Sequence, residues 1–374
     1  MAEYLTNTTD LTKVAAAIRE KGGTSDSLVY PDGFVTAIQA IQTGTELKII
    51  VSVTSGATVT ATKGSLSVSG TSVNNSCTLT VPEEGEYTVR ATLDGETSGT
   101  NIVNVVSSYD TTLAFVSTIL NDNSWELIRG ASDAGQGENL WSIGDRKEIM
   151  LNGTVGALTL SNYTTYAYII GFNHNSSLEG TNRIHFQLAK NALSGGTDVA
   201  LCDSHYNNNH NGSNFKINIP TTNSGGWNAS HMRTKICGTS LSSYSGTILA
   251  IIPEALRAVL KSVTKYTDNT GTSSAASAVT ATTDYFFLLS EYEVFGTISY
   301  GNMNEKSKQV QYSYYSAGNS RIKYNHGATS TAVIWWLRSP STQYSTNFVN
   351  VHYSGNDSTG NVSYSYGFAP GFCV

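Results

Sequence analysis

The sequence predicts a multidomain protein with α+β and all-β parts, preceded by a short helical module. Its 374 residues are enough for two or three domains with a buried core. Apolar residues follow helical spacing up to residue 44, alternate as in strands over residues 45–107, and form mixed patterns over residues 108–374. Only 13% of residues are charged, and Ser, Thr, Asn, Gly and 21 Tyr replace them. That composition is typical of β-rich, turn-rich folds.

Residues 1–44 predict two short amphipathic helices separated by the turn "YPDGF". The apolar residues recur at helical spacing, as Leu11, Val14, Ala15 and Ile18 in the first helix and as Phe34, Ile38 and Ile41 in the second. Helices this short do not bury their apolar faces alone. We therefore expect an assembly or attachment module that packs on the chain, on a second copy or on a larger structure.

Residues 45–107 predict a small antiparallel β-sandwich of the immunoglobulin-like kind. Runs such as "LKIIVSV", "ATVTAT" and "EYTVRATL" alternate apolar and polar residues between Gly, Asn and "PEEG" turns. Cys77 is the one cysteine here, so the inter-sheet disulfide of many such domains is not expected. With no pattern typical of catalysis, this part is interpreted as a spacer.

Residues 108–374 predict a mixed α+β domain with long ordered loops. Asn123 followed by Glu126 suggests a capped helix, and residues 226–237 and 252–267 have helical patterns. "YFFLLSEYEVFG" and "AVIWWLRSP" are apolar enough to be buried strands or other core segments. Polar loops lie between these elements, notably over residues 203–216 and 312–331.

Charge and terminal patterns argue against several functional classes. A net charge of −6 without a basic stripe argues against nucleic-acid binding. The longest apolar runs, such as "TILAII", are too short to cross a bilayer, so membrane insertion is not expected. The start "MAEYLTNTTD" has neither a basic nor an apolar signal region, so we expect no signal peptide.

From the patterns of titratable residues we expect no catalytic residues, no bound metal and no cofactor. Cys77, Cys202, Cys237 and Cys373 lack metal-ligand spacing and are expected to be buried free thiols. His205 and His210 allow metal binding, but solvated loop residues are the simpler interpretation. Glu291 and Glu293 are interpreted as one face of a strand rather than as an acid–base pair.

The end of the chain is polar and aromatic with almost no charge. From Ser339 to Val374 there is no Lys, Arg or Glu, and Asp357 is the one acid. As a strand, "FVNVHYSG" places Val349 and Val351 on an inner face and Asn350 and His352 on an outer one. From these residues alone, an ordinary Asn/Ser/Tyr-rich loop or β-tail remains an alternative to a binding surface.

Several ordered motifs resemble a known family. "GWNASHMRT", "FFLLSEYEVFG" and "WWLRSP" closing on "YGFAPGFCV" resemble the C-type-lectin-fold domains of variable proteins made by diversity-generating retroelements. The opening "LTKVAAAIREKGGTSDSLVYPDGFVTAIQAI" is similar to a short module of phage tail proteins. The resemblance covers most of residues 1–44 and 120–374, and implies a C-type-lectin-like domain over 108–374. It also implies that Trp335, Trp336, Phe368, Phe372 and Cys373 form the core frame.

The resemblance implies a hypervariable surface near the end of the chain. In such proteins, copying errors at template adenines change the first two positions of the Asn codons AAC and AAT. Single changes give Tyr, His, Asp, Ser or Thr, and the third-position pyrimidine excludes Lys, Glu, Gln, Trp and Met. From Tyr344 to Tyr366 none of those five excluded residues occurs. The predicted ligand-binding residues are Tyr344, Ser345, Asn347, Asn350, His352, Tyr353, Ser354, Asn356, Asp357, Ser358, Asn361, Ser363, Tyr364 and Tyr366. Residues 312–327 are a weaker candidate for framing the same surface.

The implied function is adhesion without chemistry. We expect a phage tail receptor-binding component, located in the virion, that binds a protein or glycan receptor on the host cell. Residues 1–44 would contact other tail proteins, and the family suggests a homo-oligomer such as a trimer. Two alternatives stay open: a bacterial surface adhesin with the same variable domain, and an enzyme on a lectin-like fold that acts on glycans.

Overall fold

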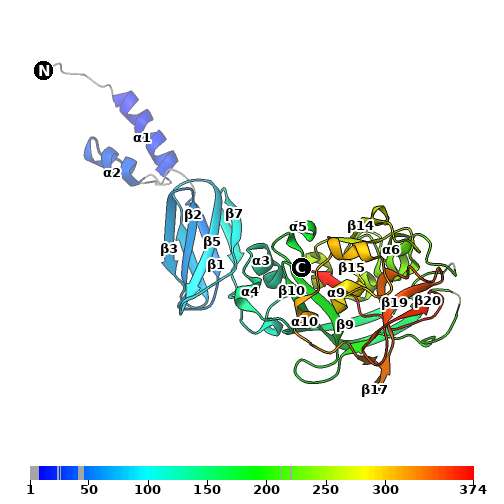
Figure 1. The fold of residues 1–374 in the computed structure, drawn as a ribbon. Helices are drawn as coiled ribbons and strands as arrows, with labels where there is room; N and C mark the ends of the chain where they lie inside the picture. The colour runs from blue at the N-terminus through cyan, green and yellow to red at the C-terminus, as the bar shows by residue number, and fades with distance from the viewer. Residues whose placement is uncertain (1–7, 23–24, 26, 41–45, 211, 220) are drawn as a thin grey trace. The chain divides into compact units, whose positions relative to one another are not determined.

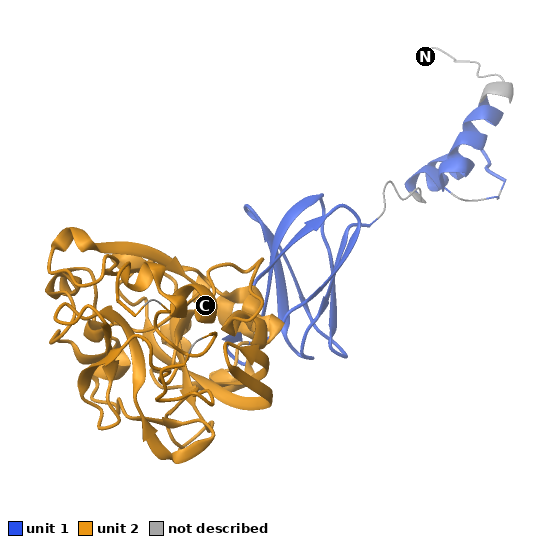
Figure 2. Ribbon diagram, turned by 90° about the vertical axis from the view of Figure 1, so that its right-hand side faces the viewer, with its two compact units in different colours: residues 1–115 blue, residues 116–374 orange. Residues whose placement is uncertain are grey.

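A computed structural model describes residues 8–22, 25, 27–40, 46–210, 212–219 and 221–374. The chain divides into two compact units, residues 1–115 and 116–374 (Figure 2). The protein combines helices and strands in several sheets, which confirms a multidomain class with α+β and all-β parts. Among the residues described, no helix is both long and apolar enough to cross a membrane.

The first unit begins with two helices, α1 (Thr8–Gly22) and α2 (Asp32–Ala40) (Figure 1). Both predicted helices are therefore confirmed, while Ile41 lies outside the described residues. Their shared core is small and consists of Ala15, Ile18 and Phe34. Val14 and Ile38 are about half exposed although the helical spacing assigned them to the apolar faces. A core this small leaves apolar surface exposed to solvent.

Two sheets with a shared apolar core form the rest of the first unit. One sheet has the order β4-β1-β8, and the other has the order β3-β2-β5-β6, with β7 also paired to β5. The strands are β1 (Lys48–Ser52), β2 (Thr58–Lys63), β3 (Leu66–Thr71), β4 (Ser76–Thr80), β5 (Gly85–Leu93), β6 (Glu96–Thr97), β7 (Asn101–Val105) and β8 (Ser108–Thr112). Alternate residues of both sheets face the core. Each run predicted as a strand is one, and β8 continues the fold past residue 107.

A five-stranded antiparallel sheet organises the second unit, in the order β15-β21-β11-β10-β9. These strands are β9 (Arg146–Val155), β10 (Leu158–Phe172), β11 (Ile184–Lys190), β15 (Phe286–Phe287) and β21 (Gly371–Cys373). Phe372 pairs with Phe186 on one side and Phe286 on the other, so the end of the chain lies inside the sheet. Phe368, Phe372 and Cys373 are buried, as predicted.

The candidate site lies on a separate antiparallel sheet, β18-β19-β20, visible in orange and red in Figure 1. Its strands are β18 (Trp335–Pro340), β19 (Asn347–Val351) and β20 (Asp357–Asn361). Other strands pair as β13 (Val263–Asp268) with β14 (Val279–Asp284), and as β12 (Val199–Ala200) and β17 (Ala328–Val333) with β16 (Lys323–Asn325). The prediction that "WWLRSP" is a buried strand is confirmed.

Short helices occupy the connections of the second unit. They are α3 (Trp125–Asp133), α4 (Gly137–Leu140), α5 (Ser176–Glu179), α6 (Gly226–Ala229), α7 (Ile248–Ile251), α8 (Glu254–Val259), α9 (Glu291–Phe295) and α10 (Ser313–Ser316). Single turns are η1 (Leu120–Asp122), the π-helix η2 (Met232–Cys237), η3 (Ala276–Ala278) and η4 (Met303–Ser307). All four cysteines are free and buried, as predicted.

Three local predictions were wrong. Residues 252–267 form a helix only up to Val259, and then β13 alternates its side chains as a strand does. Glu291 and Glu293 lie in helix α9 rather than in a strand, because Ser290 and Glu293 form a capping box. The cap of α3 is Ser124 rather than Asn123.

Candidate ligand-binding surface

The segment that follows β18 forms two turns around a central strand. β19 pairs with β18 on one side and with β20 on the other, so backbone hydrogen bonds fix both of its edges. The turn from β19 to β20 is closed by the Gly355 N–H donating to the His352 carbonyl oxygen at 2.8 Å. Turns at the ends of paired strands expose side chains on a rigid base.

Most of the predicted binding residues are accessible to solvent. Tyr344 and Tyr353 are each 54% exposed and Tyr364 is 37% exposed. The other exposed or partly exposed members are Ser345, Asn347, His352, Ser354, Asn356, Asp357, Ser358 and Asn361. Large exposed tyrosines next to small polar residues are typical of adaptable binding surfaces.

Asn350, Ser363 and Tyr366 are buried, so the prediction that they belong to the exposed surface was wrong. Asn350 lies opposite Trp336 of β18 in the sheet register. A Cβ atom added at Gly360 would lie 2.5 Å from Tyr366 and 2.9 Å from the Asn350 amide nitrogen. Tyr366 and Trp336 therefore enclose the face of β19 that the strand pattern assigned to solvent. The hydroxyl of Ser363 instead donates to Asn361 Oδ1 at 2.7 Å within a turn.

A series of aromatic rings connects the core to this surface. The Trp336 and Tyr366 ring centroids are 4.6 Å apart, and those of Tyr366 and the exposed Tyr364 are 5.8 Å apart. The Tyr206 ring lies 6.2 Å from that of Tyr366, and its hydroxyl accepts a hydrogen bond from the Ile334 N–H. Centroid separations of this size are favourable for aromatic pairs. The rings therefore restrict the orientation of Tyr364.

The loop 203–216 contributes residues that the sequence analysis did not assign to the site. The Asn207 N–H donates to the Ser365 carbonyl oxygen, and the Ser365 N–H donates to the Asn208 carbonyl oxygen. Ser365 also donates its hydroxyl to buried Asp203 at 2.8 Å. These bonds place "HYNNNH" beside Tyr364, with the rings of His205 and His210 stacked at 3.7 Å. The composition of "HYNNNH" is similar to that of residues 344–366, and this similarity is the sequence signal that could have assigned the loop to the site.

Two further segments contact the turns. Ile322, in the predicted framing loop 312–327, lies 3.0 Å from the position of a Cβ atom added at Gly355. Asn223 donates its amide hydrogens to the carbonyl oxygens of Ser341, Tyr344 and Asn347. The surface is therefore assembled from several loops around β19 and the two strands paired with it.

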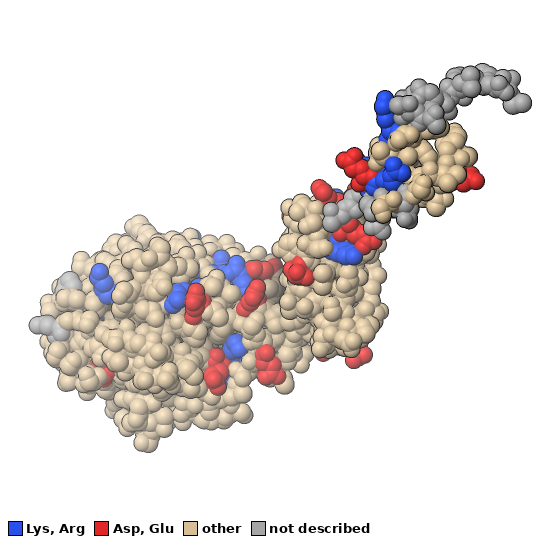
Figure 3. Space-filling view, turned by 180° about the vertical axis from the view of Figure 1, so that it is seen from behind, with Lys and Arg blue, Asp and Glu red and all other residues tan. Residues whose placement is uncertain are grey.

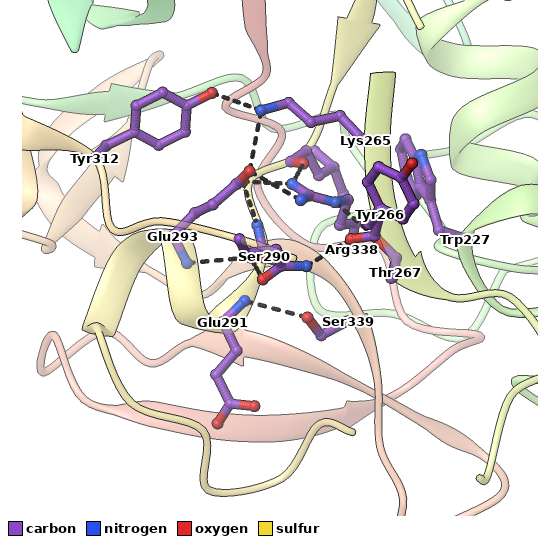
Figure 4. Close-up of polar contacts among 12 residues, drawn as sticks. Trp227, Lys265, Tyr266, Thr267, Ser290, Glu291, Glu293, Tyr312, Arg338 and Ser339 are labelled. Carbon is purple, nitrogen blue, oxygen red and sulfur yellow. Dashed lines mark hydrogen bonds and ion pairs between the residues drawn. The ribbon is translucent and has the colours of Figure 1, made fainter. Parts of the chain in front are cut away.

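A buried ionic network includes Arg338 of β18 and residues of neighbouring elements (Figure 4). Arg338 of β18 donates to Thr267 of β13 and to the Leu288 carbonyl oxygen, each at 2.8 Å. Its guanidinium also binds both carboxylate oxygens of Glu293 in α9. Lys265 of β13 donates to the same carboxylate at 3.0 Å. Bidentate pairing is geometrically specific, so it fixes β18 relative to α9 and β13.

The carboxylic acids in this network differ in pKa, because burial raises each value and basic neighbours lower them to different extents. Burial raises the pKa of Glu305 to about 7, and hydrogen bonds from Asp268, Ser339 and Gln309 only partly oppose this. Burial likewise raises the pKa of Glu179 to about 7 despite Lys265 beside it. For Glu293, burial opposes ionisation, but Arg338 and Lys265 hold its pKa below the usual range. Glu293 is therefore the ionised partner in the network.

His174, Glu179 and Glu293 each offer a possible metal ligand, and these atoms lie within 4.8 Å of one another. Both carboxylates, however, already accept hydrogen bonds from Lys265, and Glu293 also pairs with Arg338. A cation would have to compete with two buried positive groups. The arrangement is that of an internal ion-pair network.

Charged side chains are sparse on one face of the second unit. In Figure 3, one face of residues 116–374 shows a few scattered charged groups on a surface otherwise made of uncharged residues. Such a surface offers a partner hydrogen bonds and aromatic contacts with little net electrostatic attraction.

Residues 199–374 match a family model described as "Domain of unknown function (DUF6273)". The matched range contains the sheet β18-β19-β20, the loop 203–216 and Arg338. No curated protein matches the chain.

Proposed function

We propose that the protein is an adhesion protein whose C-terminal unit has a C-type-lectin-like fold and binds a receptor through Tyr344, Tyr353, Tyr364 and the polar residues around them. One observation carries the proposal: three exposed tyrosines stand among Ser, Asn and His side chains, with Tyr344 and Tyr353 in the turns before and after β19 and Tyr364 after β20, and backbone pairing fixes both edges of β19. A rigid base loses little conformational entropy on binding. Tyrosine adds a large amphipathic contact with few rotatable bonds.

In this proposal the exposed positions are diversified by a retroelement. The hydrogen bonds that shape the turns come largely from backbone atoms, as between His352 and Asn356 and between Asn223 and Ser345. Substituting the exposed side chains leaves those bonds in place. Asn350, Ser363 and Tyr366 are removed from the variable contact set because they are buried.

The first unit serves attachment and spacing in the same proposal. Helices α1 and α2 expose Val14, Val35 and Ile38, which supports a role in joining other phage tail proteins or further copies of the chain. The immunoglobulin-like sandwich, which lies between the helices and the binding unit in the chain, is the proposed spacer. Several copies on one virion would raise the effective affinity of individually weak sites.

Binding without catalysis is supported by where the acids lie. Glu179, Glu293 and Glu305 are buried and engaged with basic or hydrogen-bonding partners below the sheet. An acid–base mechanism needs a carboxyl group within hydrogen-bonding reach of substrate. The exposed face presents mainly amides, hydroxyls and phenols, and Asp357 is the one carboxylic acid among its predicted binding residues.

The gene tests the proposed diversification. The coding DNA for residues 338–374 and its neighbourhood should contain a near-copy repeat that differs from the gene where the repeat carries adenine. A reverse transcriptase gene beside this repeat would support the proposal. Ser and Tyr codons unreachable from AAC or AAT, with no such repeat, would reject diversification and leave a fixed surface.

Binding to host cells tests the function itself. The variant Tyr344→Ser/Tyr353→Ser/Tyr364→Ser should lose cell binding while its unfolding transition matches that of the wild type. The matched control is Tyr109→Ser, which removes a 40% exposed tyrosine from the sandwich. Undiminished binding by the triple variant would contradict the assignment of the surface.

A further inference from the structure

A buried lysine and a buried glutamate lie in direct contact inside the second unit. Lys265 Nζ lies 2.7 Å from Glu179 Oε2, 3.0 Å from Glu293 Oε1 and 2.8 Å from the Tyr312 hydroxyl. The side chains of Lys265 and both glutamates are at most 2% exposed. Figure 4 shows Lys265 directed toward Glu293 and Tyr312 in the interior.

Aromatic rings pack against the amine beside its three polar partners. The Phe287 ring centroid lies 4.4 Å from Nζ and the Tyr312 ring centroid lies 5.1 Å away. Burial opposes a charged pair, because the desolvation of both charges offsets their attraction. Proton transfer within a buried contact removes both charges together.

The two carboxyl groups are not equivalent. Glu293 holds a bidentate pair with Arg338 and remains ionised, whereas Glu179 has Lys265 as its cationic partner. Glu179 also has the raised pKa that burial produces. Neighbouring groups with pKa values driven apart indicate which one reacts as the acid. Glu179 is therefore the electrophile, and Glu293 is the hydrogen-bond acceptor that orients the amine.

We propose that Lys265 and Glu179 condense into an internal isopeptide bond that ties β13 to helix α5. Lys265 passes a proton to Glu179 across their contact, which leaves an amine and a carboxylic acid. Nζ then attacks Cδ of Glu179, so a C–N bond forms and a C–OH bond breaks. One amine proton passes through Glu293 Oε1 to the departing hydroxyl, which leaves as water.

The product fits the charge balance of the network. The amide is neutral, so Arg338 and Glu293 remain as one matched ion pair in place of a four-charge cluster. Fixing the two groups in contact replaces an encounter in solution, and such placement gives very high effective concentrations. The bond would close a loop between positions 86 apart in sequence and so restrict the unfolded chain. This inference does not depend on the proposed receptor surface.

The same unit contains a matched control pair. Lys261 Nζ also lies 2.7 Å from a carboxylate oxygen, that of Asp133, but the Asp133 side chain is 52% exposed. Although partial burial opposes ionisation, Lys261 and Arg129 hold the pKa of Asp133 below its usual value. A hydrated, ionised carboxylate is a poor electrophile. Lys261 and Asp133 should stay unlinked.

The mass of the purified full-length chain tests the proposal. After unfolding in denaturant, we expect a mass lower than that of the unmodified chain by one water. A protease digest should yield a branched peptide joining Lys265 to Glu179, together with unlinked peptides containing Lys261 and Asp133. An unmodified mass for a folded sample, or a branch at Glu293, would overturn the proposal.

Two variants test the chemistry. Lys265→Met removes the nucleophile and should give the unmodified mass. In Glu179→Gln, amine attack would expel ammonia in place of water and yield the same product mass as the wild type. Loss of one water from Lys265→Met would locate the modification elsewhere and overturn the assignment. If Lys265→Met does not fold, the wild-type peptide map decides the question alone.

Discussion

The ring centroid of Tyr366 lies 4.6 Å from that of Trp336, and this pair joins the proposed receptor-binding surface to the core. Trp336 is fully buried and donates its indole N–H to the Phe215 carbonyl oxygen. Tyr366 in turn lies beside the exposed Tyr364. Neighbouring tyrosines two residues apart therefore have different roles, one in the frame and one at the surface.

Alanine substitutions should separate these two roles. Tyr366→Ala should lower the free energy of unfolding by about 3–5 kcal/mol, because it leaves a cavity against Trp336. Tyr364→Ala should change it by about 0.5 kcal/mol or less, since the ring is partly exposed. Denaturant unfolding measures both, and equal losses would contradict the division of roles.

Gly360→Ala should destabilise the sheet. The added methyl group would lie 2.5 Å from Tyr366 and 2.9 Å from the Asn350 amide, and the Trp336 ring is 3.3 Å away. Overpacking of this kind costs about 1–3 kcal/mol. Gly318→Ala is the control for steric contact, because a Cβ atom added there meets nothing within 4 Å. The positive φ of Gly318 adds backbone strain that is separate from any contact. A Gly360→Ala variant as stable as wild type would show that Tyr366 can move aside.

Arg338→Met should be strongly destabilising because it leaves Glu293 without its bidentate partner. Removing one member of a buried ion pair costs about 3–5 kcal/mol. Arg338→Met/Glu293→Gln should recover part of that loss in a double-mutant cycle. Arg129→Met removes an exposed pair with Asp133 and should cost about 1 kcal/mol or less. No recovery in the double variant would argue against direct coupling of Arg338 and Glu293.

Glu305 should make the fold less stable as the pH rises. Its folded pKa of about 7 exceeds the ordinary 4.5, so the folded state binds more protons between these values. The free energy of unfolding should therefore fall across that window, by roughly 3 kcal/mol from this group. Glu305→Gln should remove this part of the slope in a pH series of denaturant unfolding. An unchanged slope would mean that another group titrates.

The framework of the surface was predictable because local patterns decide it. The apolar character of "AVIWWLRSP" and the alternation of "FVNV" predicted both strands, and the resemblance carried by "YGFAPGFCV" predicted a buried end. The burial of Asn350 was not predictable, because a strand pattern cannot reveal that Tyr366 covers the second face. The pairing of Arg338 with Glu293 spans 45 positions, and no local pattern indicates it. The contact of residues 207–208 with Ser365 spans an even longer stretch of the sequence.

The anchoring of β18 by Arg338 bears on how this unit could be engineered. The contacts that fix β18 and the strand pairing do not involve the side chains of Tyr353, Ser354 and Asn356, and the hydrogen bonds of Ser354 with His352 lie within the turn itself. Effects of substitutions at separated sites without shared partners are close to additive. The turn 352–356 could therefore be exchanged as a cassette in a combinatorial library, with folding yield and target specificity selected independently.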